Sequence, residues 1–212
     1  YKSNIDRVAD EVNIYVTDNG TLPVTNEVIA INSLGQDFLN QVKENGDLAN
    51  KFYLVDIDNT LTDIEKDLFD IANKYTKKIN PNFKDKSPVK FDGFTNMAAF
   101  YTDLFGWNNE QLESFFRNER IEIVDKALPR PGVVDVLKKL KDNGNNIYIV
   151  TARTDKHDDM PYERAKTWLD KNGIVYDKLI VGATNKVKVC KELGIDVFID
   201  DQLNNCMKIS QS

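Results

Sequence analysis

Residues 52–62 read FYLVDIDNTLT, an apolar run that ends in two aspartates with one residue between them. A short run of large apolar side chains is typical of a strand that is buried on both faces of a parallel sheet. In an extended strand end, Asp56 and Asp58 point to one side and Ile57 points to the other. We therefore expect two carboxylates side by side at the carboxyl end of a buried strand.

Three later segments have the same character, because each is a short apolar run followed by polar residues. They are residues 147–151, 179–182 and 197–200. Apolar side chains at helical spacing precede and separate these runs, as at residues 133–140. Strands that alternate with helices predict a parallel sheet with right-handed crossovers and helices on both faces. We expect an α/β fold with a Rossmann-like parallel sheet, whose ligands lie at the carboxyl ends of the strands.

The predicted carboxyl ends carry charged and hydroxyl side chains. They present Asp56 and Asp58 after the first strand, Thr151 and Arg153 after the second, Lys186 after the third, and Asp200 and Asp201 after the fourth. Carboxylates brought together cost energy unless a cation or a shared proton compensates, and Mg2+ suits a few carboxylate oxygens with water and a phosphate. One aspartate of the first pair could attack phosphorus while the other handles the leaving-group proton. A tripeptide this short also occurs in solvated acidic turns, so the prediction depends on the whole set.

The composition argues against several other classes of protein. The chain has 28 Lys and Arg against 34 Asp and Glu, a net charge of −6, whereas binding to duplex nucleic acid needs a basic face. No apolar run approaches the ~18 residues that a membrane span needs. With one histidine, His157, and two cysteines, a Cys/His zinc site and a histidine-based nucleophile are both disfavoured. Cys190 and Cys206 fit buried thiols in a reduced compartment, so we expect a cytoplasmic protein.

Four segments together resemble the ordered motifs of the haloacid dehalogenase (HAD) superfamily. They are Asp56–Thr62, Ile149–Arg153, Lys186 and Phe198–Asp201, and the match covers about residues 51–205. The resemblance implies that Asp56 is the nucleophile and that Asp58 is the general acid/base. It also implies that Thr151, Ala152 and Lys186 hold the phosphoryl oxygens.

The same resemblance implies a Mg2+ site. Its ligands would be the carboxylates of Asp56 and Asp200 and the backbone carbonyl of Asp58, with Asp201 bound through water. The second aspartate of the first motif indicates phosphoryl chemistry rather than dehalogenation, because Asp58 can protonate an alkoxide leaving group.

Residues 62–128 form a long and largely helical excursion, which is too long for a simple loop. In the superfamily an insertion at this point is a helical C1-type cap, over a core that here comprises residues 51–61 and 129–212. The excursion is rich in aromatic residues, namely Phe91, Phe94, Phe100, Tyr101, Phe105, Trp107, Phe115 and Phe116. We expect most of these rings to form a small core, with one or two free to stack on a flat base.

Two assignments leave alternatives open. Lys188 competes with Lys186 for the third motif, and we prefer Lys186 because it opens the predicted helix nearer the strand ends. Arg153 could contact a substrate phosphate, anchor the cap or form a surface salt bridge. Residues 157–159 follow in the same loop, and we expect them to be solvated.

Within the superfamily the arrangement looks most like the 5'(3')-deoxyribonucleotidase-type branch and its bacterial nucleotidase-like relatives. The supporting residues are Asp58–Asp63, Arg130–Gly132 and Thr151–Arg153. This resemblance implies a Mg2+-dependent phosphatase that hydrolyses a small phosphate monoester, with a nucleotide as the expected substrate, through an aspartyl-phosphate. The alternatives are a sugar-phosphate phosphatase, a polynucleotide 3'-phosphatase and a non-catalytic module that binds a phosphate ligand. The oligomeric state stays open.

Residues 1–50 precede the first motif, which normally lies near the start of such chains. Residues 12–16 read as a strand, 27–31 as a second extended piece and 34–42 as a helix. We expect this segment to complete the core sheet, with residues 12–16 beside residues 197–200, as in a circularly permuted arrangement. The alternative is a separate N-terminal appendage or dimerisation arm.

Overall fold

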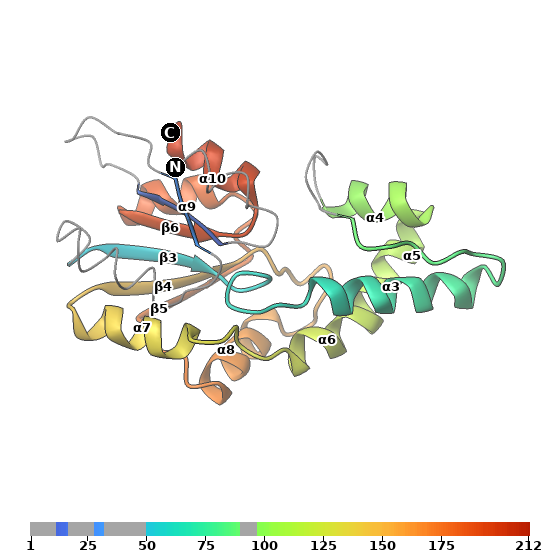
Figure 1. Cartoon of the computed structure of the whole chain (residues 1–212), viewed down its shortest axis with the longest axis horizontal. Helices are drawn as coiled ribbons and strands as arrows, with labels where there is room; N and C mark the ends of the chain where they lie inside the picture. Colours follow the sequence, from blue (N-terminus) through green and yellow to red (C-terminus); the bar gives the residue numbers. More distant parts are fainter. Residues whose placement is uncertain (1–11, 17–27, 32–49, 90–96) are drawn as a thin grey trace.

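The computed structural model describes residues 12–16, 28–31, 50–89 and 97–212, within which a six-stranded sheet lies beside a group of helices (Figure 1). In spatial order the strands are β2 (Val28–Ile31), β1 (Val12–Val16), β6 (Val197–Asp200), β3 (Phe52–Asp56), β4 (Asn146–Thr151) and β5 (Lys178–Val181). The strands β6, β3, β4 and β5 are parallel, as the sequence predicts. The register pairs Asp56 with Val150 and Val55 with Ile199, so the carboxyl ends of the central strands meet at one edge.

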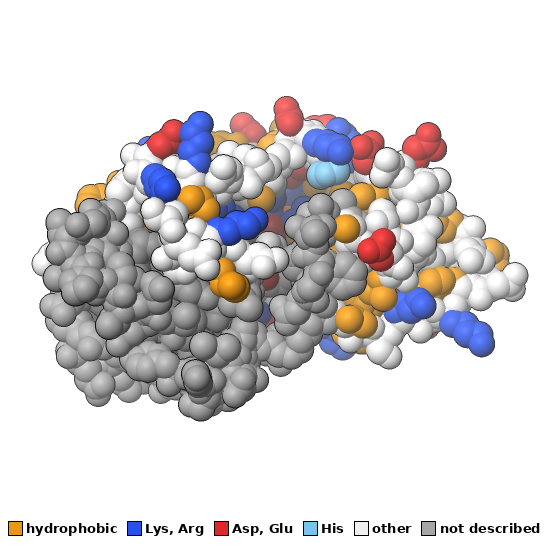
Figure 2. Space-filling model, turned by 90° about the horizontal axis from the view of Figure 1, so that it is seen from above, with side chains coloured by type: hydrophobic (Ala, Val, Ile, Leu, Met, Phe, Trp, Pro, Cys, Tyr) orange, Lys and Arg blue, Asp and Glu red, His pale blue; other side chains and the backbone are white. Residues whose placement is uncertain are grey.

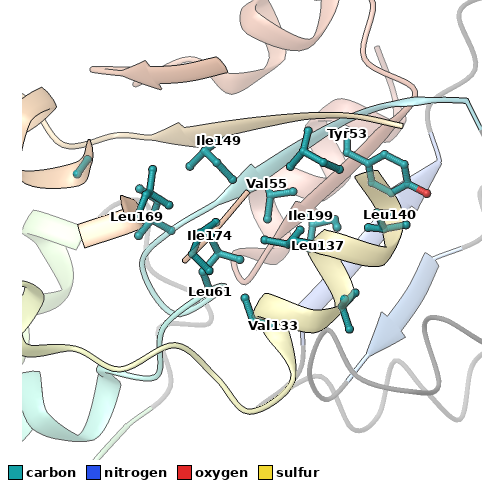
Figure 3. Close-up of a cluster of buried hydrophobic side chains, with 14 of the residues drawn as sticks. Tyr53, Val55, Leu61, Val133, Leu137, Leu140, Ile149, Leu169, Ile174 and Ile199 are labelled. Carbon is teal, nitrogen blue, oxygen red and sulfur yellow. The ribbon is translucent and has the colours of Figure 1, made fainter. Parts of the chain in front are cut away.

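The parallel strands are apolar on both faces because helices cover both faces of the sheet. Figure 1 shows α7 (Val133–Asp142) and α8 (Pro161–Lys171) on one side, and α9 (Lys186–Leu193) and α10 (Leu203–Ser210) on the other. Side chains of β3 alternate between two buried clusters, with Tyr53 and Val55 in one and Leu54 in the other. In Figure 3, Leu137 and Leu140 of α7 pack against the first of these clusters.

The insertion between β3 and α7 is helical, and we call residues 62–128 the cap. Its described elements are α3 (Glu65–Ile79), α4 (Met97–Phe105), α5 (Asn109–Ser114), the π-helix η3 (Phe115–Glu119) and α6 (Arg120–Lys126). The rings of Tyr101 and Trp107 stack 5.4 Å apart, and the Trp107 indole donates a hydrogen bond to the buried Thr76 hydroxyl at 2.9 Å. The predicted aromatic core is confirmed for Phe100, Tyr101, Phe105, Trp107 and Phe115. Phe91 and Phe94 lie outside the described residues.

The N-terminal strands extend the sheet on the β6 side. Ile14 of β1 pairs with Ile199 of β6, and β2 pairs with the other edge of β1. The expected position of residues 12–16 beside residues 197–200 is therefore confirmed. The pairing of β1 with β6 is antiparallel. A strand that followed β6 through a helical crossover would instead run parallel to β6. The circular permutation itself stays a prediction, and the helix expected at residues 34–42 lies outside the described residues.

Cys190 and Cys206 are buried thiols, as predicted, in the cluster between the sheet and the α9–α10 pair. No helix in the part of the chain that the structure describes combines the length and apolar character needed to cross a bilayer.

Candidate active site

The turn after β3 is fixed by its own hydrogen bonds. The Thr62 hydroxyl donates to the Ile57 carbonyl at 3.3 Å and accepts from the Asn59 amide at 3.1 Å. Asn59 has a φ of 61°, a left-handed conformation that asparagine tolerates better than most residues. From the segment just before α7, the Arg130 guanidinium donates to the carbonyls of Asn59 at 2.9 Å and Thr62 at 3.0 Å. This turn projects Asp58 from the sheet edge in a defined direction.

Lys186 joins the carboxylates of two neighbouring strands. It is the first residue of α9, and its ammonium lies 2.7 Å from Asp56 and 2.5 Å from Asp200. All three side chains are buried, and Asp200 is 0% exposed. Lys188, the alternative in the sequence, is exposed and pairs with Glu192. The structure therefore places Lys186, and not Lys188, between the two aspartates.

The acidic cluster holds more negative charge than one ammonium balances. Burial raises the pKa of Asp56 to about 7, because the nearby charge of Lys186 only partly offsets burial and the charges of Asp200 and Asp58. Burial and the charges of Asp200 and Asp56 likewise raise the pKa of Asp201 well above its usual range. The Asp201 amide donates to the Thr60 hydroxyl at 3.0 Å, which ties the end of β6 to the turn after β3. A further cation would relieve this excess of negative charge.

The donor set fits Mg2+ rather than a metal that needs a complete protein cage. Among the described residues, no group of three or more His, Cys, Asp or Glu side chains converges closely enough to hold an ion by itself. Asp56 and Asp200 nevertheless contact the same ammonium, so both carboxylates face one point. Mg2+ is commonly bound by one or two carboxylates, with water and substrate phosphate completing its octahedron.

Asp58 is held by two arginines from different parts of the chain. Arg153, after β4, donates from Nε to Oδ2 at 3.0 Å and from Nη2 to Oδ1 at 2.6 Å. Arg120 of the cap donates from Nη2 to the same Oδ2 at 2.9 Å. Burial acts to raise the pKa of Asp58, but the charges of Arg153 and Arg120 outweigh it and hold this pKa well below its usual range. A surface salt bridge for Arg153 is therefore wrong, because its side chain is 3% exposed and its partner is Asp58.

All the predicted site residues except Asp200, which is fully buried, line one cavity of about 230 Å³ between core and cap. From the core it is lined by Asp56, Asp58, Thr151, Ala152, Arg153, Lys186 and Asp201. From the cap it is lined by Leu68, Tyr101, Leu112, Phe116 and Arg120. Figure 2 shows the hollow, with acidic and basic side chains deep inside it. Thr151 is the buried last residue of β4, and its hydroxyl accepts from the Arg153 amide at 3.3 Å.

A model of the family described as haloacid dehalogenase-like hydrolase matches residues 51–207. The chain belongs to this family. This confirms the family resemblance, the α/β fold class and hydrolytic activity as the general chemistry of this HAD-like hydrolase.

Curated relatives of this HAD-like hydrolase include proteins named as nucleotidases. A nucleotidase of Clostridium acetobutylicum is 29% identical over 159 residues, which cover 74% of each chain. YqfW of Bacillus subtilis, described as a candidate nucleotidase, is 29% identical over 158 residues, 74% of this chain and 73% of the relative. Among solved structures, a hydrolase from Streptococcus pneumoniae TIGR4 is similar to this chain, with 14% identity and a TM-score of 0.42. The superposition covers 71% of this chain and 81% of the hydrolase.

In this HAD-like hydrolase the loop after β4 differs from the solvated loop that the sequence predicts. Asp158 is 4% exposed and accepts hydrogen bonds from the Arg164 guanidinium at 2.8 Å and the Met160 amide at 3.0 Å. The His157 ring is partly buried and lies 5.2 Å from the Phe116 ring of the cap. Only Asp159 is largely exposed. The prediction is wrong for the other two. His157 contacts Phe116 of the cap, which no local pattern reveals, and Asp158 is bound by Met160 and Arg164 at the start of α8.

Sequence reasoning also missed Arg120. A single arginine in a helical run rich in charged residues reads as a solvated helix position, and nothing in the sequence pairs it with Asp58. Its side chain is 14% exposed, because the cap places it against the core.

Proposed function

We propose that this chain is a Mg2+-dependent phosphatase that hydrolyses small phosphate monoesters, with nucleoside monophosphates as the leading substrate class. The observation that carries the proposal is the convergence of Asp56 and Asp200 on the Lys186 ammonium, beside a cavity that Asp56 and Lys186 line. The same cavity contains a second aspartate, a hydroxyl and an arginine, in Asp58, Thr151 and Arg153. A non-catalytic phosphate-binding module would have no need of Asp58 beside the nucleophile.

Asp56 would act as the nucleophile. Its carboxylate attacks the phosphorus, the ester P–O bond breaks, and an aspartyl-phosphate forms. The Lys186 ammonium, the Thr151 hydroxyl and the Ala152 backbone would hold the phosphoryl oxygens, because a doubly charged ester must be neutralised before a carboxylate approaches it.

Asp58 would act as the general acid and then as the general base. Because Arg153 and Arg120 favour its ionised form, Asp58 must first take up a proton, which then goes to the leaving alkoxide. Its carboxylate then takes a proton from the water that hydrolyses the aspartyl-phosphate, which restores the starting state.

Asp56, Asp200 and the backbone carbonyl of Asp58 would hold Mg2+, with Asp201 bound through water. When bound, the ion supplies positive charge to the phosphoryl oxygens and lowers the cost of bringing two anions together.

The preference for a nucleotide rests on two supports. The curated relatives carry nucleotidase names. The cap side of the cavity is largely apolar and includes the rings of Tyr101 and Phe116, against which a flat base could pack. A polynucleotide substrate is less well supported, because the net charge of −6 offers little attraction for a polyanion.

A substrate panel tests the proposal. Phosphate release would be measured from ribo- and deoxyribonucleoside monophosphates, sugar phosphates and a 3'-phosphorylated single-stranded oligonucleotide, each with Mg2+ and with excess EDTA. We expect Mg2+-dependent release that is fastest from nucleoside monophosphates. Release only from sugar phosphates would overturn the nucleotide assignment. If no ester released phosphate, the assignment of the chain as a phosphatase would be overturned.

A further inference from the structure

Two buried polar atoms in residues that line the cavity have no hydrogen-bond partner among the described residues. They are Nη1 of Arg153 and Nδ1 of His157. Both atoms are shielded from solvent, so bulk water does not satisfy them either. Buried polar atoms almost always have a partner, because an unpaired one keeps the full cost of its desolvation. Two such atoms in the wall of one cavity indicate that a ligand supplies the missing partners.

The unpaired end of Arg153 can only donate hydrogen bonds. Its Nε and Nη2 donate to the two carboxylate oxygens of Asp58, which holds the planar guanidinium along that edge. Nη1 lies away from that edge and carries two further N–H groups. The Asp158 carboxylate does not serve it, because the hydrogen bonds of Asp158 go to Arg164 and to the Met160 amide. The partner that Nη1 lacks is therefore a hydrogen-bond acceptor.

His157 joins this end of the cavity to the aromatic wall of the cap. Its ring lies 5.2 Å from the Phe116 ring. Burial lowers the pKa of His157, helped by the positive charge of Lys156, which favours the neutral ring near neutral pH. In a neutral ring Nδ1 either donates or accepts a hydrogen bond. An uncharged polar group is therefore a suitable partner for it.

A hydroxyl group is the ligand chemistry that fits both atoms. Its oxygen accepts a hydrogen bond from Nη1 of Arg153. A hydroxyl also serves Nδ1 of His157 in either form of the ring, because it both donates and accepts, whereas a carbonyl oxygen only accepts. A second anionic group fits less well, because Asp56, Asp58 and Asp201 line the same cavity.

The place of the two atoms matches the sugar of a nucleotide. In the proposed function the phosphoryl group lies at Asp56 and the leaving oxygen lies at Asp58. Arg153 holds Asp58, so its free end lies on the leaving-group side of the ester. His157 lies against Phe116, on the wall proposed for the base. The part of a nucleotide between its phosphate and its base is the sugar.

We propose that His157, together with Nη1 of Arg153, forms a polar subsite that binds a sugar hydroxyl of the substrate, an inference that rests on the proposed function. His157 is then a specificity-determining residue with no part in the transfer of the phosphoryl group. A substrate without the hydroxyl leaves the buried polar atoms unpaired in the complex, which lowers kcat/KM for that substrate.

Four substrates with one base and different sugars test the subsite. They are a nucleoside 5'-monophosphate and its 2'-deoxy, 3'-deoxy and 2',3'-dideoxy analogues, assayed for phosphate release in Mg2+. In the wild type we expect kcat/KM for the ribonucleotide to exceed that for the dideoxy analogue about 10- to 100-fold. The two monodeoxy analogues show which hydroxyl the subsite binds.

Variants of His157 assign the preference to this residue. His157→Phe keeps a ring against Phe116 and removes Nδ1. We expect it to narrow the ratio between the ribo and dideoxy substrates about 3- to 10-fold, with kcat/KM for the dideoxy substrate within about twofold of the wild type. His157→Asn, whose amide places a polar atom at the position of Nδ1, should restore part of the ratio. Lys156→Met, at the exposed neighbouring residue, is the matched control and should keep the wild-type ratio.

Similar kcat/KM values of the wild type for all four substrates would overturn the subsite and leave the proposed phosphatase intact. An unchanged ratio in a folded His157→Phe variant, or an equal narrowing in Lys156→Met, would overturn the role of His157. If the wild type releases no phosphate from any nucleotide, the nucleotide assignment fails, and this inference fails with it. Circular dichroism of each variant would check that the fold is retained.

Discussion

At the residue scale, the Asp56 carboxyl lies between opposing influences. Burial raises its pKa, the Lys186 ammonium 2.7 Å away lowers it, and Asp200 and Asp58 raise it again. A nucleophilic carboxylate must be ionised, so positive charge near Asp56 is a requirement of the proposed chemistry.

Replacing Asp56 by Asn tests the nucleophile. The amide oxygen can still accept a hydrogen bond from Lys186, so we expect the variant to fold, but kcat should fall by about 10^3-fold or more. Phosphate release and circular dichroism would be measured together, with Asp85→Asn on the exposed cap surface as the control. Undiminished turnover in a folded Asp56→Asn variant would refute the assignment.

His157 is the one histidine of the chain, and it lies outside the acidic cluster. Burial lowers its pKa from the usual 6.5, helped by the positive charge of Lys156. Below pH 6.5 the unfolded chain therefore binds this proton more readily than the folded chain, so the stability that neutral His157 provides is lost as the pH falls.

The variant His157→Phe should remove this pH dependence while keeping a ring against Phe116. We expect the melting temperature of the wild type to drop more between pH 7.5 and pH 5.5 than that of His157→Phe. Thermal unfolding followed by circular dichroism at both pH values measures the difference. The same drop in both proteins would show that His157 titrates alike in the folded and unfolded states.

At the element scale, the start of α9 determines which lysine reaches the acidic cluster. The Asn185 side chain caps the helix by accepting from the Lys188 amide at 3.1 Å. With about 100° of rotation per residue, Lys186 and Lys188 point to nearly opposite sides of the helix. Lys186 therefore faces Asp56 and Asp200, and Lys188 faces solvent.

The two lysines provide a matched pair of variants. We expect Lys186→Met to lower kcat by about 10²-fold or more, because it removes the ammonium that neutralises phosphoryl oxygens. Lys188→Met, two residues along the same helix, should leave kcat within about twofold of the wild type. Steady-state phosphate release would show the contrast, and comparable losses in both variants would contradict the assignment of Lys186.

At the scale of the whole molecule, the core supplies the charged floor of the cavity and the cap supplies its apolar wall. The carboxylates of the acidic cluster carry more negative charge than the one ammonium of Lys186 can neutralise. A divalent cation should therefore bind the folded chain and stabilise it. An ion that binds only the folded state at a concentration of 100 Kd stabilises it by about 2.7 kcal/mol.

Mg2+ should therefore raise the melting temperature of the wild type in a concentration-dependent way. Asp200→Asn should reduce this rise strongly, because it removes one of the two converging carboxylates, whereas the exposed Asp155→Asn should retain it. Differential scanning fluorimetry over a Mg2+ titration measures both without any substrate. A rise in Asp200→Asn equal to that of the wild type would place the ion elsewhere.

The four parallel strands, their helices and the side chains at their carboxyl ends could be predicted from the amino-acid pattern. Strands β3, β4 and β6 are short apolar runs because they are largely buried, whereas β5 lies at the sheet edge and is only partly buried. Parallel strands bring these ends to one edge whatever the rest of the chain does, so Asp56, Asp58, Thr151, Lys186 and Asp201 could be assigned to one site. The preference for Lys186 over Lys188 followed from its expected place at the start of the helix, nearer the strand ends.

How the cap meets this edge depends on the packing of the whole chain. That packing brings Arg120 to Asp58 and Phe116 to His157, although nothing in the local sequence marks these residues as partners. Periodicity reports which side of an element is buried, but not which distant element covers it. Contacts between a helical insertion and a loop about forty residues away depend on the packing of the whole chain, so a local pattern cannot specify them.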